Sequence, residues 1–186
     1  MDFLEKDLEE IIYNADRPDL WDRGLEIEGL IKRQLRIGNY GVADLVSFEK
    51  SYFMNGVKVM PFLKITVYEL KKDKIGISAF LQAVKYCKGI RTYIERNHPG
   101  MKISLNISLV GNDVDTSGSF VFLTDLIQHS DFESFPCGEI YRVNFYKYSY
   151  KIDGLFFETI SDYNLTDTGL KIKPRKMRVQ ATDNPF

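Results

Sequence analysis

The segment from Ile103 to Leu109 places an apolar residue at every second position, with serine or asparagine between. Because successive side chains of a strand point to opposite faces, this alternation predicts a half-buried strand, which ends before the turn residues Gly111, Asn112 and Asp113. A strand with one apolar face needs neighbouring strands and a layer that covers that face. The segment therefore predicts a sheet packed against other elements.

Two other segments repeat their apolar residues at the three-to-four-residue spacing of a helix. The first predicts a helix over residues 2 to 14, with Asp2 as its N-cap, which breaks at Asp16-Arg17-Pro18. The second predicts a helix from Ser78 to Asn97, with Ser78 as its N-cap. These helices are the expected cover of the sheet.

Branched and aromatic residues predict further strands between and after the helices. Residues 25–37 and 42–48 are expected to pair as a hairpin, and 62–70 to form a third strand after the turn signal Asn55-Gly56. Residues 139–150 and 154–160 are typical of a second hairpin. Residues 120–130 could form a short helix. The order helix, three strands, helix, strand predicts an α/β fold with a central sheet.

The length of 186 residues suits one domain, expected over residues 1–173, followed by a loose basic and polar tail at 174–186. Cys87 and Cys137 lie in no metal-binding or disulfide pattern. The acidic amino terminus and the lack of an apolar run of ~20 residues predict neither secretion nor membrane insertion, so we expect a cytoplasmic protein. The formal charge of −1 indicates that any contact with nucleic acid is local or metal-assisted.

Three ionisable residues occupy predicted strands where valine or threonine would be ordinary. Asp44 lies within an apolar strand, and Glu69 and Lys71 lie at the end of another, two residues apart and hence on one face. Two carboxylates suit Mg²⁺ or Mn²⁺, and a nearby lysine could hold a water molecule or neutralise a phosphodiester in reaction. The alternative is a surface ion pair between Glu69 and a neighbouring lysine.

Three sequence motifs resemble the PD-(D/E)XK nuclease superfamily, and they are closest to its RecB-like branch. The motifs are Gly41-Val42-Ala43-Asp44-Leu45-Val46, Ile65-Thr66-Val67-Tyr68-Glu69-Leu70-Lys71 and Gln82-Ala83-Val84-Lys85-Tyr86. The segment from Leu4 to Glu9 and Gln34 also resemble mismatch-cleaving endonucleases of that group. The resemblance covers about residues 3–110. It implies a restriction-endonuclease-like αβββαβ core. The strands predicted beyond residue 139 make residues 111–173 a peripheral β-rich extension.

The resemblance also implies the roles of individual residues. Asp44 and Glu69 would bind Mg²⁺ or Mn²⁺, with the Leu70 carbonyl as a further ligand, and Lys71 would be the catalytic lysine. The residues that would support the site or contact the substrate are Gln82, Tyr86 and Gln34.

Two glutamates of the first predicted helix are further candidates. Glu5 and Glu9 lie one helical turn apart and so share a face. One of them, with Glu5 preferred from the resemblance, could supply another carboxylate to the metal. The alternative is a solvated acidic face of an amphipathic helix.

The implied activity is hydrolysis of DNA phosphodiester bonds that leaves a 5′-phosphate, by an enzyme acting as a homodimer or within a larger nucleic-acid-processing complex. One alternative is an inactive nuclease fold that serves as a binding or structural module for a nucleic-acid or protein partner. It is favoured by Val42 and Ala43 before Asp44, where the superfamily commonly has proline or an Arg-x pair. Another alternative is an α/β protein unrelated to nucleases, in which the order of the motifs is chance.

Overall fold

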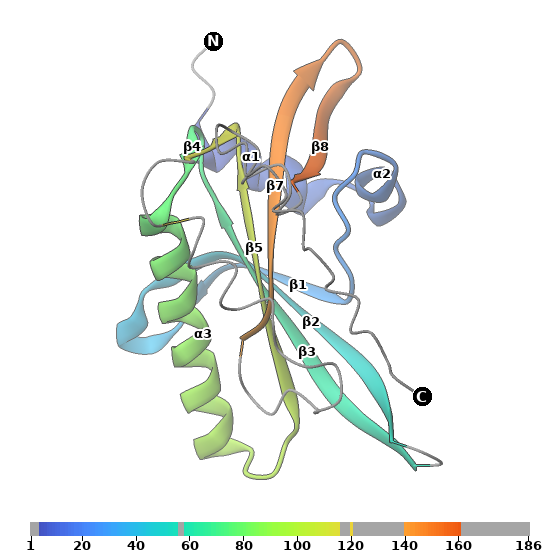
Figure 1. The fold of residues 1–186 in the computed structure, drawn as a ribbon, viewed down its shortest axis with the longest axis vertical. Helices are drawn as coiled ribbons and strands as arrows, with labels where there is room; N and C mark the ends of the chain where they lie inside the picture. Colours follow the sequence, from blue (N-terminus) through green and yellow to red (C-terminus); the bar gives the residue numbers. More distant parts are fainter. Residues whose placement is uncertain (1–3, 56–57, 116–119, 121–139, 161–186) are drawn as a thin grey trace, which may run out of the picture.

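The computed structural model describes residues 4–55, 58–115, 120 and 140–160, and shows an α/β fold with a six-stranded central sheet (Figure 1). The elements in chain order are α1 (Glu5–Asn14), α2 (Arg17–Asp22), β1 (Leu30–Arg36), the 3₁₀ turn η1 (Gly38–Tyr40), β2 (Val42–Asn55), β3 (Lys58–Leu70), β4 (Lys74–Ile75), α3 (Ile77–Asn97), β5 (Ile103–Gly111), β6 (Asp113–Val114), β7 (Ile140–Lys151) and β8 (Gly154–Ile160).

The central sheet is mixed, with strand order β1-β2-β3-β5-β7-β8. The pairs β1/β2, β2/β3 and β7/β8 are antiparallel, whereas β3, β5 and β7 run parallel. The parallel pair β3/β5 needs a crossover, and α3 lies within that connection. The short strands β4 and β6 form a separate parallel pair. The predicted α/β fold with a central sheet is confirmed, and α1, β1 to β3, α3 and β5 occur in the expected order, with α2 and β4 in addition.

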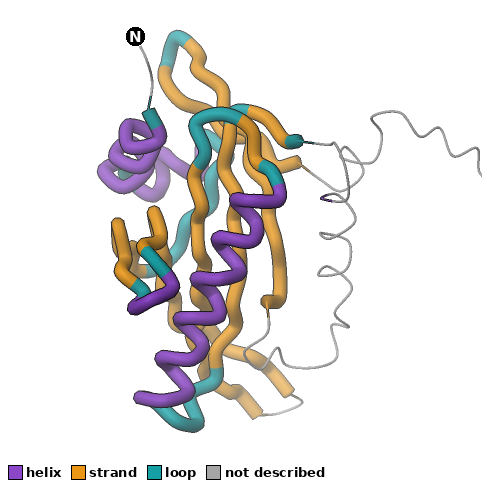
Figure 2. Tube along the Cα trace, turned by 90° about the vertical axis from the view of Figure 1, so that its left-hand side faces the viewer, coloured by secondary structure: helices purple, strands orange, loops and turns teal. Residues whose placement is uncertain are grey.

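Helix α3 lies along one face of the sheet (Figure 2). On this face, alternate residues of β3, β5 and β7 are apolar and buried. These residues are Ile65, Val67, Ile103, Leu105, Ile107, Leu109, Val143 and Phe145. The predicted helix is confirmed at its carboxyl end. Its N-cap residue is Gly76 and not the expected Ser78, because the helix already begins at Ile77.

The opposite face of the sheet is covered at one end by α1, α2 and the loop that follows them. Helix α1 begins at Glu5, so the N-cap position belongs to Leu4 and not to the expected Asp2. The first turn is held by the Leu4 amide, which donates to the Asp7 carboxylate at 2.8 Å. The helix ends where the prediction placed its break, but α2 follows at once with Pro18 in its first turn, where proline is tolerated.

The first strand is shorter than expected, since β1 begins at Leu30 and the prediction began it at residue 25. Leu25 and Ile27 are buried as the alternation indicated, but they lie in the loop that packs against α1 and α2. Gly29 ends this loop with a φ of +76°, and a β-carbon there would lie 2.3 Å from the Phe48 carbonyl oxygen. The close approach and the turn of the backbone separate the buried loop from the strand.

Strands β2 and β3 are longer than expected, and they form a hairpin that extends beyond the rest of the sheet (Figure 1). Their pairing continues to Asn55 and Lys58, so β3 contains Pro61, which the prediction left outside the strand. The pairing of β3 with β5 begins only at Leu63. Pro61 therefore lies where β3 is an edge strand, and its missing N–H breaks no bond with β5.

The carboxyl-terminal hairpin is confirmed by β7 and β8, which pair from Lys151 and Gly154 onward and join the central sheet beside β5. Of the expected helix over 120–130 the structure describes only residue 120, and the expected tail at 174–186 lies outside the described residues. Within the described ranges, no helix is both long and apolar enough to cross a bilayer.

Candidate active site

Asp44 lies at the point where β2 separates from β3. The register of the two strands begins at Leu45 and Tyr68, so Asp44 has no paired residue on β3. The side chain of Asp44 contacts the end of β3, because the Leu70 amide donates to its Oδ2 atom at 2.9 Å. This bond holds a carboxylate next to the end of β3.

Glu69 and Lys71 stand at the end of β3 and form an ion pair. The Lys71 Nζ atom donates to Glu69 Oε1 at 2.8 Å. Glu69 continues the alternation of Ile65 and Val67, so it belongs to the face that α3 covers. The Glu69 side chain is 1% exposed, whereas that of Lys71 is 22% exposed. The carboxylate is therefore held inside the fold and the ammonium lies at its boundary.

The second oxygen of Glu69 has no hydrogen-bond partner among the described residues, although it is buried. Burial, together with the charge of Asp44, raises the pKa of Glu69 to about 7, and Lys71 only partly opposes this. Burial also raises the pKa of Asp44 above its usual range. The hydrogen bond from the Leu70 amide and the charge of Lys71 act to lower this pKa but do not cancel the effect of burial. Because buried carboxylates are costly without compensating charge, this pair would gain from a cation.

Lys71 stays charged in this environment. Burial alone would lower its pKa, but the hydrogen bond to Glu69 and the charges of Glu69, Glu5 and Asp44 raise the pKa above its ordinary value. One ammonium therefore faces several carboxylates. A lysine held in this state can donate hydrogen bonds and neutralise anionic charge, but it does not act as a base.

Gln82 and Tyr86 lie one turn apart on α3, and the Gln82 amide donates to the Tyr86 hydroxyl at 2.7 Å. Burial raises the pKa of Tyr86, and the charges of Glu69 and Asp44 raise it further. The tyrosine therefore shares the electrostatic environment of the two carboxylates.

Gly41, the residue directly before β2, brings the backbone close to the ring of Tyr86. A β-carbon at Gly41 would lie 3.0 Å from Tyr86 Cε1, so a larger residue would push against the ring. The sequence did not predict that Gly41 lies close to Tyr86, although Gly41 is the first residue of the first motif.

The two glutamates of α1 occupy different environments. Glu5 lies beside Lys71, with 3.9 Å between its Oε2 atom and Lys71 Nζ, and it accepts a bond of 3.4 Å from the Lys72 amide. Glu9 is buried, and both of its oxygens accept hydrogen bonds, one from Arg33 and one from Gln34. Of the two, Glu5 is the one that reaches the lysine of the site.

Gln34 is placed differently from the other expected site residues, because its amide is engaged by Glu9. In the register of β1 and β2, Gln34 and Asp44 are opposite each other, but they are not a paired position. Gln34 also has a φ of +48°. Arg33, which the motifs do not indicate, neutralises Glu9 beside Gln34. Gln34 is therefore tied to α1 and not to the Glu69–Lys71 pair.

The residues present fit a hard divalent cation bound by few protein ligands. The described part of the chain contains no group of three or more histidine, cysteine, aspartate or glutamate side chains placed to hold a metal. Asp44 and Glu69 nevertheless supply two carboxylates, and one oxygen of Glu69 is unsatisfied within the same part. Mg²⁺ commonly takes one or two carboxylates and keeps several water molecules, so this donor set suits it.

Comparison of this chain with protein-family models, with curated proteins and with solved structures finds no match.

Proposed function

We propose that the protein is a metal-dependent nuclease that hydrolyses phosphodiester bonds in DNA. In this proposal Asp44 and Glu69 bind Mg²⁺ or Mn²⁺, and the Leu70 carbonyl and Glu5 complete the ligand set. Lys71 is the catalytic lysine. The residues that support it are Gln82 and Tyr86. The fold is then of the restriction-endonuclease-like class, as the sequence motifs imply.

The observation that supports the proposal best is the unsatisfied oxygen of Glu69. A purely structural ion pair would use both carboxylate oxygens or expose the free one to water, because a buried unpaired oxygen costs about 1–3 kcal/mol. Here the Glu69 Oε2 atom is buried without a partner among the described residues, while Oε1 is bound by Lys71. A cation that binds between Asp44 and Glu69 would satisfy it.

Each residue then has a chemical task. When bound, the metal supplies positive charge that lowers the pKa of a water molecule and stabilises charge on the phosphate. Lys71, held by Glu69, donates hydrogen bonds to the attacking water or to a phosphate oxygen. The Gln82 amide holds the Tyr86 hydroxyl in place beside the site. The Leu70 amide keeps the Asp44 carboxylate at the end of β3.

The test is cleavage of labelled single-stranded, double-stranded and branched DNA with Mg²⁺ or Mn²⁺. The site variants are Glu69→Gln and Lys71→Met. Glu95→Gln is the matched control, because that carboxylate is 61% exposed and pairs with Arg91 near the far end of α3. We expect metal-dependent cutting that both site variants lose and the control keeps. Cutting by the site variants, or no cutting of any substrate by the native chain, would contradict the proposal.

The second candidate is a binding module with the same fold and no turnover. One observation favours it, namely that Arg33 and Gln34 occupy both oxygens of Glu9, which withdraws one carboxylate from the site. Calorimetric titration with Mn²⁺ separates the two candidates. An ion-pair network would not bind the metal, whereas a nuclease site binds it and loses binding in Asp44→Ala.

A further inference from the structure

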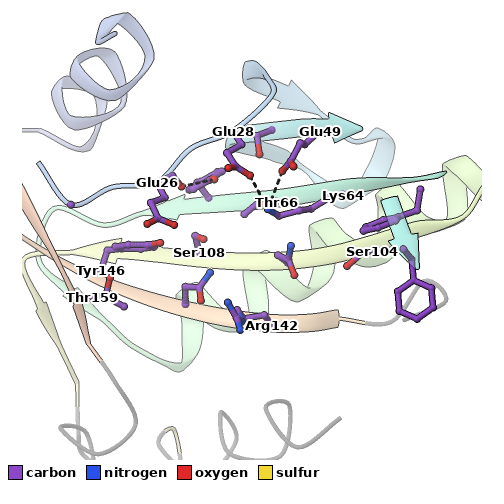
Figure 3. Close-up of a pocket in the computed structure, with 17 residues that line it drawn as sticks. Glu26, Glu28, Glu49, Lys64, Thr66, Ser104, Ser108, Arg142, Tyr146 and Thr159 are labelled. Carbon is purple, nitrogen blue, oxygen red and sulfur yellow. Dashed lines mark hydrogen bonds and ion pairs between the residues drawn. The ribbon is translucent and has the colours of Figure 1, made fainter. Parts of the chain in front are cut away.

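A polar pocket of about 500 Å³ lies on the face of the sheet that α3 does not cover (Figure 3). Its floor is formed by β3, β5 and β7, beside the end of the sheet that α1 and α2 close. Glu69 belongs to the other face of β3, so this pocket is separate from the candidate active site. Its volume falls in the range of about 300–1,000 Å³ that is typical of small-molecule sites.

On β5, the floor of the pocket consists of small polar residues at positions where a packed sheet would carry large apolar ones. On β5, Ser104, Asn106 and Ser108 alternate with the apolar residues that face α3, and each of the three is at most 6% exposed. The Asn106 Oδ1 atom is buried and has no hydrogen-bond partner among the described residues. A hydrogen-bond donor from a ligand would satisfy this acceptor.

The charged residues of the pocket divide into a set joined by ion pairs and an unpaired set. Lys64 is bound by Glu28 at 3.1 Å and by Glu49 at 2.9 Å, so these three side chains together carry a net charge of −1. The side chains of Arg142 and Glu26 line the same pocket and form no ion pair with any described residue. Among the described residues of the lining, Arg142 is therefore the cation outside an ion pair, and Glu26 is the carboxylate outside one.

These two charges lie apart along the pocket. Figure 3 shows Glu26 and Tyr146 at one end, with Arg142 farther along β7. Glu26 is close enough to Tyr146 to raise the pKa of its hydroxyl, which burial raises more strongly. The backbones of Arg142 and Tyr146 lie four positions apart on β7, a span of about 13 Å. The Arg142 charge still reaches the Tyr146 hydroxyl, where it acts to lower the pKa. A ligand that uses both charges is therefore elongated.

Asn106 lies on the floor of the pocket at the level of Arg142. Strand register pairs Asn106 of β5 with Arg142 of β7, so the unsatisfied acceptor is next to the arginine on the floor. Along the pocket, a cation and a free acceptor therefore lie side by side, and an anion lies farther along.

This order matches the parts of a nucleotide. A guanidinium binds a phosphate through two parallel hydrogen bonds. A free amide oxygen accepts from a ribose hydroxyl, and a carboxylate accepts from the N–H groups on the edge of a base. Inorganic phosphate alone would leave most of the cavity, the Asn106 acceptor and the Glu26 carboxylate unused.

We propose that this polar pocket binds a nucleoside 5′-monophosphate, with Arg142 on the phosphate, Asn106 on a ribose hydroxyl and Glu26 on the base. The inference goes beyond the proposed nuclease function and does not depend on it. The monophosphate is either a free nucleotide or the 5′-phosphorylated end of a strand, because both carry the same group.

The test is calorimetric titration of the full chain with AMP, GMP, CMP and UMP, in EDTA so that no divalent metal takes part. Inorganic phosphate, the unphosphorylated nucleosides and a 5′-phosphorylated tetraribonucleotide are the further probes. We expect at least one monophosphate to bind, and to bind more tightly than its nucleoside and than phosphate. Tetranucleotide binding of equal strength supports a strand end as the source, and weaker binding supports a free nucleotide.

Variants locate the site. Arg142→Gln and Glu26→Gln change exposed side chains, so the fold should persist, and Asn106→Ala removes the buried acceptor. Each should weaken binding about tenfold or more, since each removes a hydrogen bond to the ligand. Arg96→Gln, at an exposed arginine of α3, is the matched control and should bind as the native chain does.

The inference is overturned if no monophosphate binds, or if Arg142→Gln binds as tightly as the native chain. Because the titrations contain EDTA and measure binding alone, their failure leaves the nuclease proposal intact. Failure of DNA cleavage would likewise leave this inference intact.

Discussion

The Asp44 carboxylate accepts a hydrogen bond of 2.9 Å from the backbone amide of Leu70. The bond joins β2 to β3 beyond the last ladder pair, that of Leu45 and Tyr68. A side chain therefore extends the contact between the two strands at this point, while its negative charge remains available to a cation. Structural and ligand-binding roles of Asp44 can be separated by substitution.

Asp44→Asn should keep the fold and lose metal binding. The asparagine oxygen can still accept from the Leu70 amide, whereas the negative charge is removed. We expect the unfolding free energy to change little, and DNA cleavage with Mg²⁺ to fall by about a hundredfold or more, as for the loss of one preorganised electrostatic group. Mn²⁺ calorimetry and urea unfolding check the two parts. Equal metal affinity in the native chain and Asp44→Asn would contradict the assignment.

Lys71→Met should destabilise the protein at pH 8, where Glu69 of the native chain is mostly ionised. The variant leaves the Glu69 carboxylate buried without its partner, which we expect to lower the unfolding free energy by about 1–3 kcal/mol. The double variant Lys71→Met with Glu69→Gln should recover part of this loss, because no buried charge remains. Urea unfolding of all four proteins gives the coupling between the two residues. Additive losses would show that the ion pair contributes nothing.

In the metal-free protein, the contribution of Glu69 to stability should fall as the pH rises from about 4.5 to about 7. Burial and Asp44 raise the pKa of Glu69 from 4.5 to about 7 in the folded state. At Glu69 the folded state therefore binds more proton than the unfolded state in this window, and this one group lowers the unfolding free energy by about 3 kcal/mol across it.

Glu69→Gln isolates this contribution, because glutamine does not titrate. The native curve of unfolding free energy against pH, measured in EDTA, should fall relative to that of Glu69→Gln until the pH passes 7. Addition of Mn²⁺ at pH 7.5 should stabilise the native chain and not the variant. Parallel curves for the two proteins would show that Glu69 does not titrate in this window.

Gly41→Ala should disturb Tyr86 as well as the backbone. Gly41 has a φ of +117°, and an added β-carbon would lie 3.0 Å from Tyr86 Cε1. We expect a loss of about 1–3 kcal/mol in unfolding free energy, together with lower cleavage activity. Gly38→Ala is the control, since Gly38 has a φ of +48° and no atom lies within 4 Å of its added β-carbon. Equal effects of both substitutions would show that Tyr86 plays no part.

Periodicity in the sequence was sufficient for the elements whose burial repeats regularly. The alternation in β5 and the helical spacing in α3 report which side chains face the core, and both elements were predicted within a few residues. The same reasoning misplaced the start of β1, because Leu25 and Ile27 are buried in a loop, and burial alone does not define a strand.

That Glu69 and Lys71 share a face follows from the sequence alone, since residues two apart on a strand always do. Three features instead required the folded chain: the bond from the Leu70 amide to Asp44, the pairing of Glu9 with Arg33, and the pocket over the polar residues of β5. The physical reason is that local spacing sets the direction of a side chain, whereas its neighbours depend on strand register and on packing between distant segments. Charge pairing and cavities arise from those long-range contacts.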